Sequence, residues 1–333
     1  MDHCRRIVLA GVLAGLVACS GGDVGTGAGG TGSTAALPRA ADLCVSNDCG
    51  SATILVAIPD AENILFADDG RLFVTGGENL YEIHKSADGS FSATPLYDGT
   101  CSFTGMAIMQ GWLYANGCDD HSLLAARLTA TPQLAKIYQY TGFCIPNGMA
   151  AGPDGRLYVV DEPLNCQAAD PKIVRITLSD ATHVSAQDTW VQGSPTGLLP
   201  FGGDNVLRFP NGLVRDGSTF YGTDGGSVFS VQLGSDGSAG EVLPLFWEPT
   251  AHDDIGLCGD CLLVADFFGG RIALLSRDGE LLQETLQQTF TAVSSVRLGR
   301  PPLFAPTDVL VTDKGVIGDN DLPIDYLAVF RRD

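Results

Sequence analysis

Basic side chains are scarce in this sequence of 333 residues, in which 19 Lys and Arg face 39 Asp and Glu and leave a formal net charge of −20. Affinity for nucleic acid comes mainly from Lys and Arg that neutralise phosphates, so an acidic chain without a basic run is a poor nucleic-acid binder. Only five His occur, which disfavours a metal oxidoreductase with several imidazole ligands. The absence of a Gly-x-Ser-x-Gly motif leaves an α/β-hydrolase serine mechanism without support.

Long apolar runs are missing beyond the first twenty residues, so no later segment is predicted to span a membrane. At the N-terminus, Arg5 and Arg6 precede uncharged, mostly apolar residues from Ile7 to Ala18. That run is too short for a bilayer and typical of a secretory signal. It ends in Leu-Val-Ala-Cys19, which resembles the bacterial lipoprotein signal, whose Cys is lipidated and becomes the new N-terminus. The alternative is an ordinary signal peptide in which Cys19 has no role.

This resemblance divides the chain into three parts. Residues 1–18 are expected to be a lipoprotein signal peptide, 19–50 a lipidated Cys with a flexible Gly/Ser/Thr-rich tether, and 51–333 the folded domain. Because Ser20 rather than Asp follows the Cys, the resemblance implies a lipid anchor in the bacterial outer membrane. The domain, expected to be a monomer, would then lie in the periplasm or on the cell surface.

Eight cysteines remain once Cys4 and Cys19 are set aside, and an even number in an oxidising compartment favours disulfides. The simplest pairing joins neighbours: Cys44–Cys49, Cys101–Cys118, Cys144–Cys166 and Cys258–Cys261. The rival is a metal site at Cys258-Gly-Asp-Cys261. Its spacing matches half a zinc site, although no second Cys-x-x-Cys or His pair accompanies it.

A repeat follows the tether. Six segments begin with a short polar anchor and an apolar run, at Glu62, Thr104, Asn147, Asn211, Asp253 and Pro306. Each continues through a turn, often Asp-Gly, into a second run: RLFVTG, WLYANG, RLYVVD, TFYGTD, LLVADF and VIGDND. Asp-Gly between short β-rich runs is a hairpin signal, since Gly supplies the positive φ of tight turns.

Six units of four short strands at a spacing of about forty to sixty residues predict an all-β, six-bladed β-propeller. The third repeat carries an insertion between Cys166 and Arg208 that includes GSPTGLLPFGG. The last repeat ends after its third strand, so Ala52–Ile58 is predicted to supply the missing fourth strand and close the ring. Two stacked β domains are the alternative architecture.

The anchors are the candidate site, because the first strand of each propeller blade lines the central channel. Glu62, Thr104, Asn147, Asn211, Asp253 and Pro306 or Thr307 should meet at one end of the axis, with Asp254 as a further carboxylate. An oxygen-only cluster suits a hard divalent cation, most simply Ca²⁺. Two carboxylates would also be costly together without a cation. The predicted metal ligands are Glu62, Asn147, Asn211 and Asp253.

Over roughly residues 52–333 the chain resembles the six-bladed gluconolactonase/regucalcin (SMP-30-like) family, with paraoxonases as more distant relatives. The closest matches are PNGMAAGPDGRLYVVD and FPNGLVRDGSTFYGTD. The family's metal ligands fall at the four residues just named, and the pair Asp253-Asp254 is similar to a paraoxonase ligand pair. The family's sugar-binding Arg is replaced by Ile145, and the paraoxonase His by Thr104.

The resemblance implies metal-assisted hydrolysis of a lactone or ester, in which Asp253 or Asp254 takes the proton of the attacking water. His252 and His121 are spare candidates for that base. The alternative is a non-catalytic propeller, a scaffold lipoprotein whose cation ties blades together while another face binds an extracytoplasmic protein. Propellers serve both purposes, so the fold does not choose between them.

Overall fold

The computed structural model describes residues 36–333 apart from 118–119, 165–169, 195–205 and 316–324. The predicted signal peptide, Cys19 and most of the tether therefore lie outside the described residues, as does most of the GSPTGLLPFGG segment. The described part of the chain holds 24 strands and a short 3₁₀ helix, η1 (Ala40–Asp42). No helix there is long and apolar enough to cross a bilayer.

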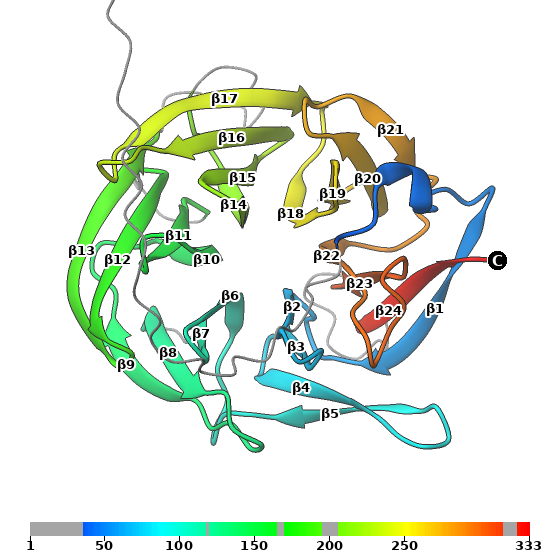
Figure 1. The fold of residues 1–333 in the computed structure, drawn as a ribbon, viewed down its shortest axis with the longest axis horizontal. Coiled ribbons are helices and arrows are strands. Elements are labelled where there is room, and N and C mark those ends of the chain that lie inside the picture. Colours follow the sequence, from blue (N-terminus) through cyan, green and yellow to red (C-terminus); the bar gives the residue numbers. More distant parts are fainter. Residues whose placement is uncertain (1–35, 118–119, 165–169, 195–205, 316–324) are drawn as a thin grey trace, which may run out of the picture. The chain divides into compact units, whose positions relative to one another are not determined.

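The strands form six four-stranded antiparallel sheets, the blades, arranged around a central axis (Figure 1). Blade one is β2 (Ile64–Phe66), β3 (Leu72–Thr75), β4 (Leu80–Lys85) and β5 (Phe91–Pro95). Blade two is β6 (Phe103–Met109), β7 (Trp112–Gly117), β8 (Ser122–Arg127) and β9 (Ala135–Gln139). Blade three is β10 (Ile145–Ala151), β11 (Leu157–Glu162), β12 (Lys172–Asp180) and β13 (His183–Gln192).

Blade four is β14 (Pro210–Asp216), β15 (Thr219–Asp224), β16 (Ser227–Leu233) and β17 (Ala239–Trp247). Blade five is β18 (His252–Leu257), β19 (Cys261–Asp266), β20 (Arg271–Ser276) and β21 (Leu281–Glu284). Blade six is β22 (Val293–Leu298), β23 (Val309–Asp313), β24 (Tyr326–Arg332) and β1 (Gly50–Ala57). The predicted six-bladed β-propeller is confirmed.

Blade six closes the ring with strands from both ends of the domain. β1 pairs antiparallel with β24, from Gly50 opposite Arg332 to Ala57 opposite Tyr326. Figure 1 shows β1 on the outer side of β24. The prediction that an N-terminal strand supplies the missing fourth strand is therefore confirmed, and this pairing leaves β24 without a free edge.

The alignment of the sixth repeat was wrong. Its inner strand is β22, which begins at Val293, whereas Pro306 and Thr307 lie in the connection that leads to the second strand, β23. The error has a physical reason. The inner strand reads Val-Ser-Ser-Val-Arg-Leu, and its two Ser side chains are buried against polar partners, so the strand lacks the apolar pattern that marks the other inner strands. The apolar run after Pro306 is more conspicuous but belongs one strand farther out.

The core lies between blades rather than within them. Each of six clusters of buried side chains draws on two neighbouring blades. Between blades three and four, for example, Tyr158 contacts Trp190 and Phe220 with ring centroids 4.7 and 4.5 Å apart. Burial of such rings contributes a large share of the free energy of folding, so blade-to-blade packing fixes the positions of the inner strands.

Two of the predicted disulfides are confirmed, Cys44–Cys49 and Cys258–Cys261, with Cα atoms 6.0 and 5.0 Å apart. The second lies at the hairpin between β18 and β19, so these two cysteines are joined to each other and do not form half a zinc site. Cys101 and Cys144 are disulfide-bonded as well. Their predicted partners, Cys118 and Cys166, lie outside the described residues.

Candidate functional site

The anchor segments of neighbouring blades are held together by hydrogen bonds from the second strands. Side chains near the ends of four of these strands donate to the backbone carbonyl of the anchor in the next blade. They are Thr75 to Thr104, Asn116 to Asn147, Thr223 to Asp253 and Thr312 to Glu62, at 2.8, 2.6, 2.7 and 2.6 Å. Three of the predicted metal ligands are thus positioned through their own carbonyl groups.

We expect Thr223→Val to lower the free energy of unfolding by about 2 kcal/mol, because it strands two buried backbone groups. The Thr223 hydroxyl donates to the Asp253 carbonyl and accepts from the Gly212 N–H at 2.8 Å. Urea unfolding measures the change. Thr219→Val, which removes a half-buried hydroxyl bonded to Gln232, is the matched control and should cost well under 1 kcal/mol. An equal loss in both variants would contradict this role for Thr223.

Glycines allow the inner strands to approach closely around the axis. A Cβ on Gly148 would lie 2.3 Å from the carbonyl oxygen of Asn211, and one on Gly212 would lie 2.6 Å from the Cα of Asp254. Real contacts of that length do not occur, so a side chain at either position would force the blades apart. The close approach brings the anchors of blades three, four and five to one end of the axis, as the repeat predicts.

Part of the acid excess has a structural role. Second strands in four blades carry an Asp as their last or next-to-last residue, and the carboxylates bind backbone N–H or hydroxyl groups of their own blade: Asp161, Asp224, Asp266 and Asp313. Asp161, for instance, accepts from the N–H of Cys144 and Ile145 at 2.7 and 3.1 Å, directly ahead of Asn147. A carboxylate with several such donors fixes the loop that leads into an inner strand.

Glu62 and Asp253, the two predicted carboxylate ligands, are buried, with 3% and 7% of their surfaces exposed. Burial raises the pKa of Asp253 well above its usual range, and the charge of Glu62 raises it further, while Lys314 opposes both. The pKa of Glu62 is raised by burial and lowered in part by Lys314. Both carboxylates are thus influenced by the same ammonium, that of Lys314.

Lys314 is a member of this site that the sequence reading missed. Its ammonium forms an ion pair with Glu62 Oε2 and lies 3.7 Å from Asp60 Oδ1. The charges of Glu62, Asp60 and Asp253 raise the pKa of Lys314 against the effect of its burial, so it carries a positive charge at neutral pH. The repeat marked Asp313-Lys314-Gly315 only as a turn. The one feature of the sequence that could have drawn attention to Lys314 is the rarity of Lys in this chain.

Glu162 is the second missed residue. It ends β11, is buried, and accepts a 2.9 Å hydrogen bond from Asn147 Nδ2. Burial raises the pKa of Glu162 to about 7, with the Asn147 hydrogen bond opposing and the charge of Glu62 adding to the shift. This hydrogen bond orients the Asn147 amide. Its Nδ2 is bound to Glu162, and its oxygen, Oδ1, has no hydrogen-bond partner among the described residues.

Asp254 is placed differently from Asp253. Its Oδ2 accepts from Ser295 Oγ at 2.5 Å and lies 2.8 Å from Arg297 Nη1. One Asp254 oxygen is therefore already occupied by two donors, so Asp253 is the better candidate for accepting a proton. Burial lowers the pKa of His252 to about 4, and its ring lies beside Phe246. His252 is therefore neutral at pH 7. His121 lies in the turn between β7 and β8.

A hard divalent cation fits the chemistry of the remaining oxygens. Among the described residues, the buried Asn147 Oδ1, Asp253 Oδ1 and Asp254 Oδ1 have no hydrogen-bond partner. Leaving such atoms unpaired is costly, and carboxylate and amide oxygens are the ligands of Ca²⁺. No group of three or more His, Cys, Asp and Glu in the described ranges is arranged to hold a metal. A site here would thus need the amides of Asn147 and Asn211 beside Glu62 and Asp253.

Titration of the Glu162 carboxyl should make stability depend on pH in metal-free buffer. As pH rises from about 5 to about 8, we expect this group to lower the free energy of unfolding by on the order of 3 kcal/mol. A carboxyl whose folded pKa is raised binds its proton more tightly in the folded state. The stabilisation is thus complete below the unfolded pKa, near 4.5, and is lost as pH passes the folded value of about 7. Urea unfolding of Glu162→Gln should show a flatter pH profile. Exposed Glu280→Gln is the control, and a profile unchanged in Glu162→Gln would contradict the assignment.

The chain has no match among protein-family models and none among curated proteins. Among solved structures it is similar to a protein assigned as a gluconolactonase, at 16% identity and a TM-score of 0.65, over 90% of this chain and 97% of that one. A gluconolactonase from Xanthomonas campestris shares 16% identity at a TM-score of 0.63, over 90% and 94%. Regucalcin from Agrobacterium tumefaciens, a calcium-binding protein, shares 15% at 0.62, over 84% and 93%. At these identities the likeness concerns the fold: the chain shares the six-bladed propeller of the gluconolactonase and regucalcin structures.

Proposed function

We propose that this propeller is a metal-dependent hydrolase of lactones or esters, with its site at the end of the axis where Glu62, Asn147, Asn211 and Asp253 lie. The observation that carries the proposal is that Asn147 Oδ1 and Asp253 Oδ1 are buried without a hydrogen-bond partner, near the buried Glu62 and its ion-pair partner Lys314. A cluster of this kind at the axis is a binding site rather than a packing feature, because packing alone would not leave buried acids unpaired. The gluconolactonase and regucalcin neighbours support the same chemistry.

In this mechanism each side chain has a defined task. A divalent cation held by Glu62, Asn147, Asn211 and Asp253 would polarise the substrate carbonyl and lower the pKa of an attacking water. Glu162 orients the Asn147 amide by accepting from its Nδ2. A bound cation would keep Asp253 ionised, and the Asp253 oxygen not used for the cation would be the base that takes the proton from the attacking water. The water oxygen bonds to the carbonyl carbon, the ring or ester C–O bond breaks, and the proton passes to the leaving oxygen.

The proposal also includes the cellular location of the enzyme. The lipoprotein-like signal predicted over residues 1–18 and Cys19 supports an enzyme anchored in the outer membrane, and the disulfides Cys44–Cys49 and Cys258–Cys261 agree with an oxidising compartment. A lactone or ester that reaches the periplasm or cell surface would be the substrate.

The test is a panel of γ-lactones, δ-lactones and aryl esters, assayed with Ca²⁺ and with EDTA. Glu62→Gln keeps the size of the side chain and removes its charge, so we expect activity to fall by roughly two orders of magnitude or more. The control is Glu82→Gln, which alters a buried Glu of the same blade on β4 and should leave activity intact. Equal turnover by the wild type and Glu62→Gln would rule out the proposed metal-dependent hydrolysis. If Ca²⁺ then stabilises the protein without supporting turnover, the result favours the scaffold alternative.

A further inference from the structure

A cavity lies farther along the axis than the candidate metal site, toward the other end of the inner strands. It has a volume of about 320 Å³ and is lined by residues from all six inner strands and from the segments next to them. Along β10, Asn147 belongs to the first site and Ala151 lines this cavity. Ala151 is four positions beyond Asn147, about 13 Å at about 3.3 Å per residue, and Met149, two positions beyond it, begins the lining. Its size is that of a small-molecule pocket, about 300–1,000 Å³.

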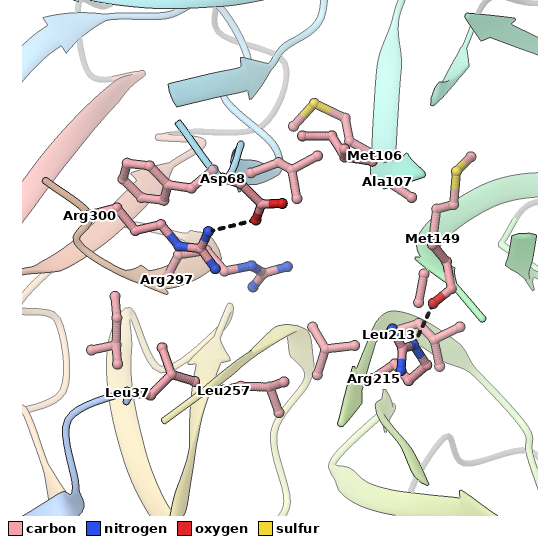
Figure 2. A pocket seen from close by; sticks show the side chains of 17 residues that line it. Leu37, Asp68, Met106, Ala107, Met149, Leu213, Arg215, Leu257, Arg297 and Arg300 are labelled. Atoms are coloured by element: carbon pink, nitrogen blue, oxygen red, sulfur yellow. Dashed lines mark hydrogen bonds and ion pairs between the residues drawn. The ribbon is translucent and has the colours of Figure 1, made fainter. Parts of the chain in front are cut away.

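Apolar and polar surface line this cavity in nearly equal parts, and the apolar part is aliphatic for the most part. Leu65, Met106, Met149, Leu213 and Leu257 come from five different blades and line it together (Figure 2). Such a surface favours the hydrocarbon portion of a ligand, because apolar area removed from water stabilises the complex.

Three Arg residues surround the same cavity, in a chain where acids outnumber bases two to one. Figure 2 shows Arg297 and Arg300 on one side and Arg215 on the other. Arg215 donates from Nε to the Ala151 carbonyl at 2.5 Å and from Nη1 to the Gly217 carbonyl at 2.6 Å. These neutral acceptors hold the guanidinium in place without cancelling its charge.

Few carboxylates offset the positive charge of these Arg residues. Arg300 Nη1 lies 3.4 Å from Asp68 Oδ1, and the Asp68 side chain is fully exposed, so that pair is weak. Arg297 uses one nitrogen, Nη1, for Asp254 and for the Ile255 carbonyl at 2.8 Å. With Asp68 and Asp254 set against the three Arg, the cavity keeps one net positive charge, at Arg215, and the Arg297 guanidinium carries further N–H donors.

We propose that this cavity binds a small organic anion with a hydrocarbon portion, of the class of a medium-chain carboxylate. The aliphatic part of the wall takes the chain, and the guanidiniums of Arg215 and Arg300 bind the carboxylate oxygens, for which their fork geometry is suited. The site is separate from the proposed hydrolase site and does not depend on it.

The test is calorimetric titration of the purified chain with octanoate, with octanamide as an uncharged probe and acetate as a probe without a chain. Octanoate should bind at least about tenfold more tightly than either. The double variant Arg215→Gln/Arg300→Gln should weaken octanoate binding by about tenfold or more. The matched control is Arg156→Gln/Arg331→Gln, which alters two Arg paired with Asp at comparable exposure outside the cavity, and it should bind as the wild type does.

A second variant tests the aliphatic part without altering charge. Ala151→Phe, at the half-buried end of β10, places a ring in the cavity and should weaken octanoate but not acetate. Glu62→Gln should leave octanoate binding unchanged even if it abolishes hydrolysis, which separates this site from the proposed function. The proposal is overturned if octanamide binds as tightly as octanoate, if the Arg double variant binds like the wild type, or if octanoate does not bind.

Discussion

Lys314→Met should destabilise the metal-free protein by about 3–5 kcal/mol at pH 8 and tighten its binding of Ca²⁺ by at least about tenfold. The two effects have one cause. The Lys314 ammonium pairs with Glu62 and also acts on the charge of Asp253. Its removal leaves buried carboxylates without a counter-charge, which is costly until another cation replaces it. Because the same ammonium repels a divalent ion, its removal should strengthen the binding of that ion.

Urea unfolding in EDTA and in Ca²⁺, with calorimetric titration of Ca²⁺, measures both effects. Calcium should restore most of the stability that Lys314→Met loses, since a ligand bound only by the folded state stabilises it. The loss should be smaller at pH 5, where the raised pKa values of Glu62 and Asp253 let these groups protonate. Lys136→Met removes an exposed pair with Asp120 and serves as the control. A variant that binds Ca²⁺ no better than the wild type would show that Lys314 does not compete for the cation position.

The fold could be predicted because its signals are local and repeated. Hairpin turns such as Asp154-Gly155, where Gly155 has φ 75°, recur between short apolar runs, and their sixfold recurrence favours a propeller. Blade six shows the limit. Ser295 of β22 is polar in sequence, yet its hydroxyl is buried against Asp254 from the neighbouring blade. A pattern of apolar residues does not reveal a polar strand whose partners lie 41 residues away.

The candidate site could be predicted only where it follows the repeat. Glu62, Asn147 and Asp253 lie just before or within the first three residues of inner strands, so the repeat alone is enough to predict that they converge. Glu162 and Lys314 lie at or after the ends of second strands, where the sequence shows turns and acids without indicating which side chains point to the axis. Ring closure sets blade six beside blade one and so places Lys314 against Glu62, although 252 residues separate them in the sequence.

A buried ion cluster in blade five should be the most sensitive structural point outside the axis. Arg271 is 9% exposed and bridges three acids, with Nε 2.6 Å from Asp266 Oδ2, Nη1 2.5 Å from Glu284 Oε2, and Nη2 paired with Glu248. Asp266 is fully buried and also accepts from the Gly269 N–H at 2.9 Å. The guanidinium thus compensates carboxylates from strands and loops that are distant in sequence.

Arg271→Met is therefore expected to lower the free energy of unfolding by about 3–5 kcal/mol, because it leaves Asp266 buried beside other acids with no cation. Urea unfolding at pH 7 measures the loss, and Arg175→Met is the control, since its partner Asp188 is 44% exposed and such a pair contributes about 1 kcal/mol or less. The double variant Arg271→Met/Asp266→Asn should recover part of the loss by removing the stranded charge. If the double variant is instead as unstable as the sum of the two single variants, the cost comes from lost packing of the Arg271 side chain, and the charge argument for this cluster is wrong.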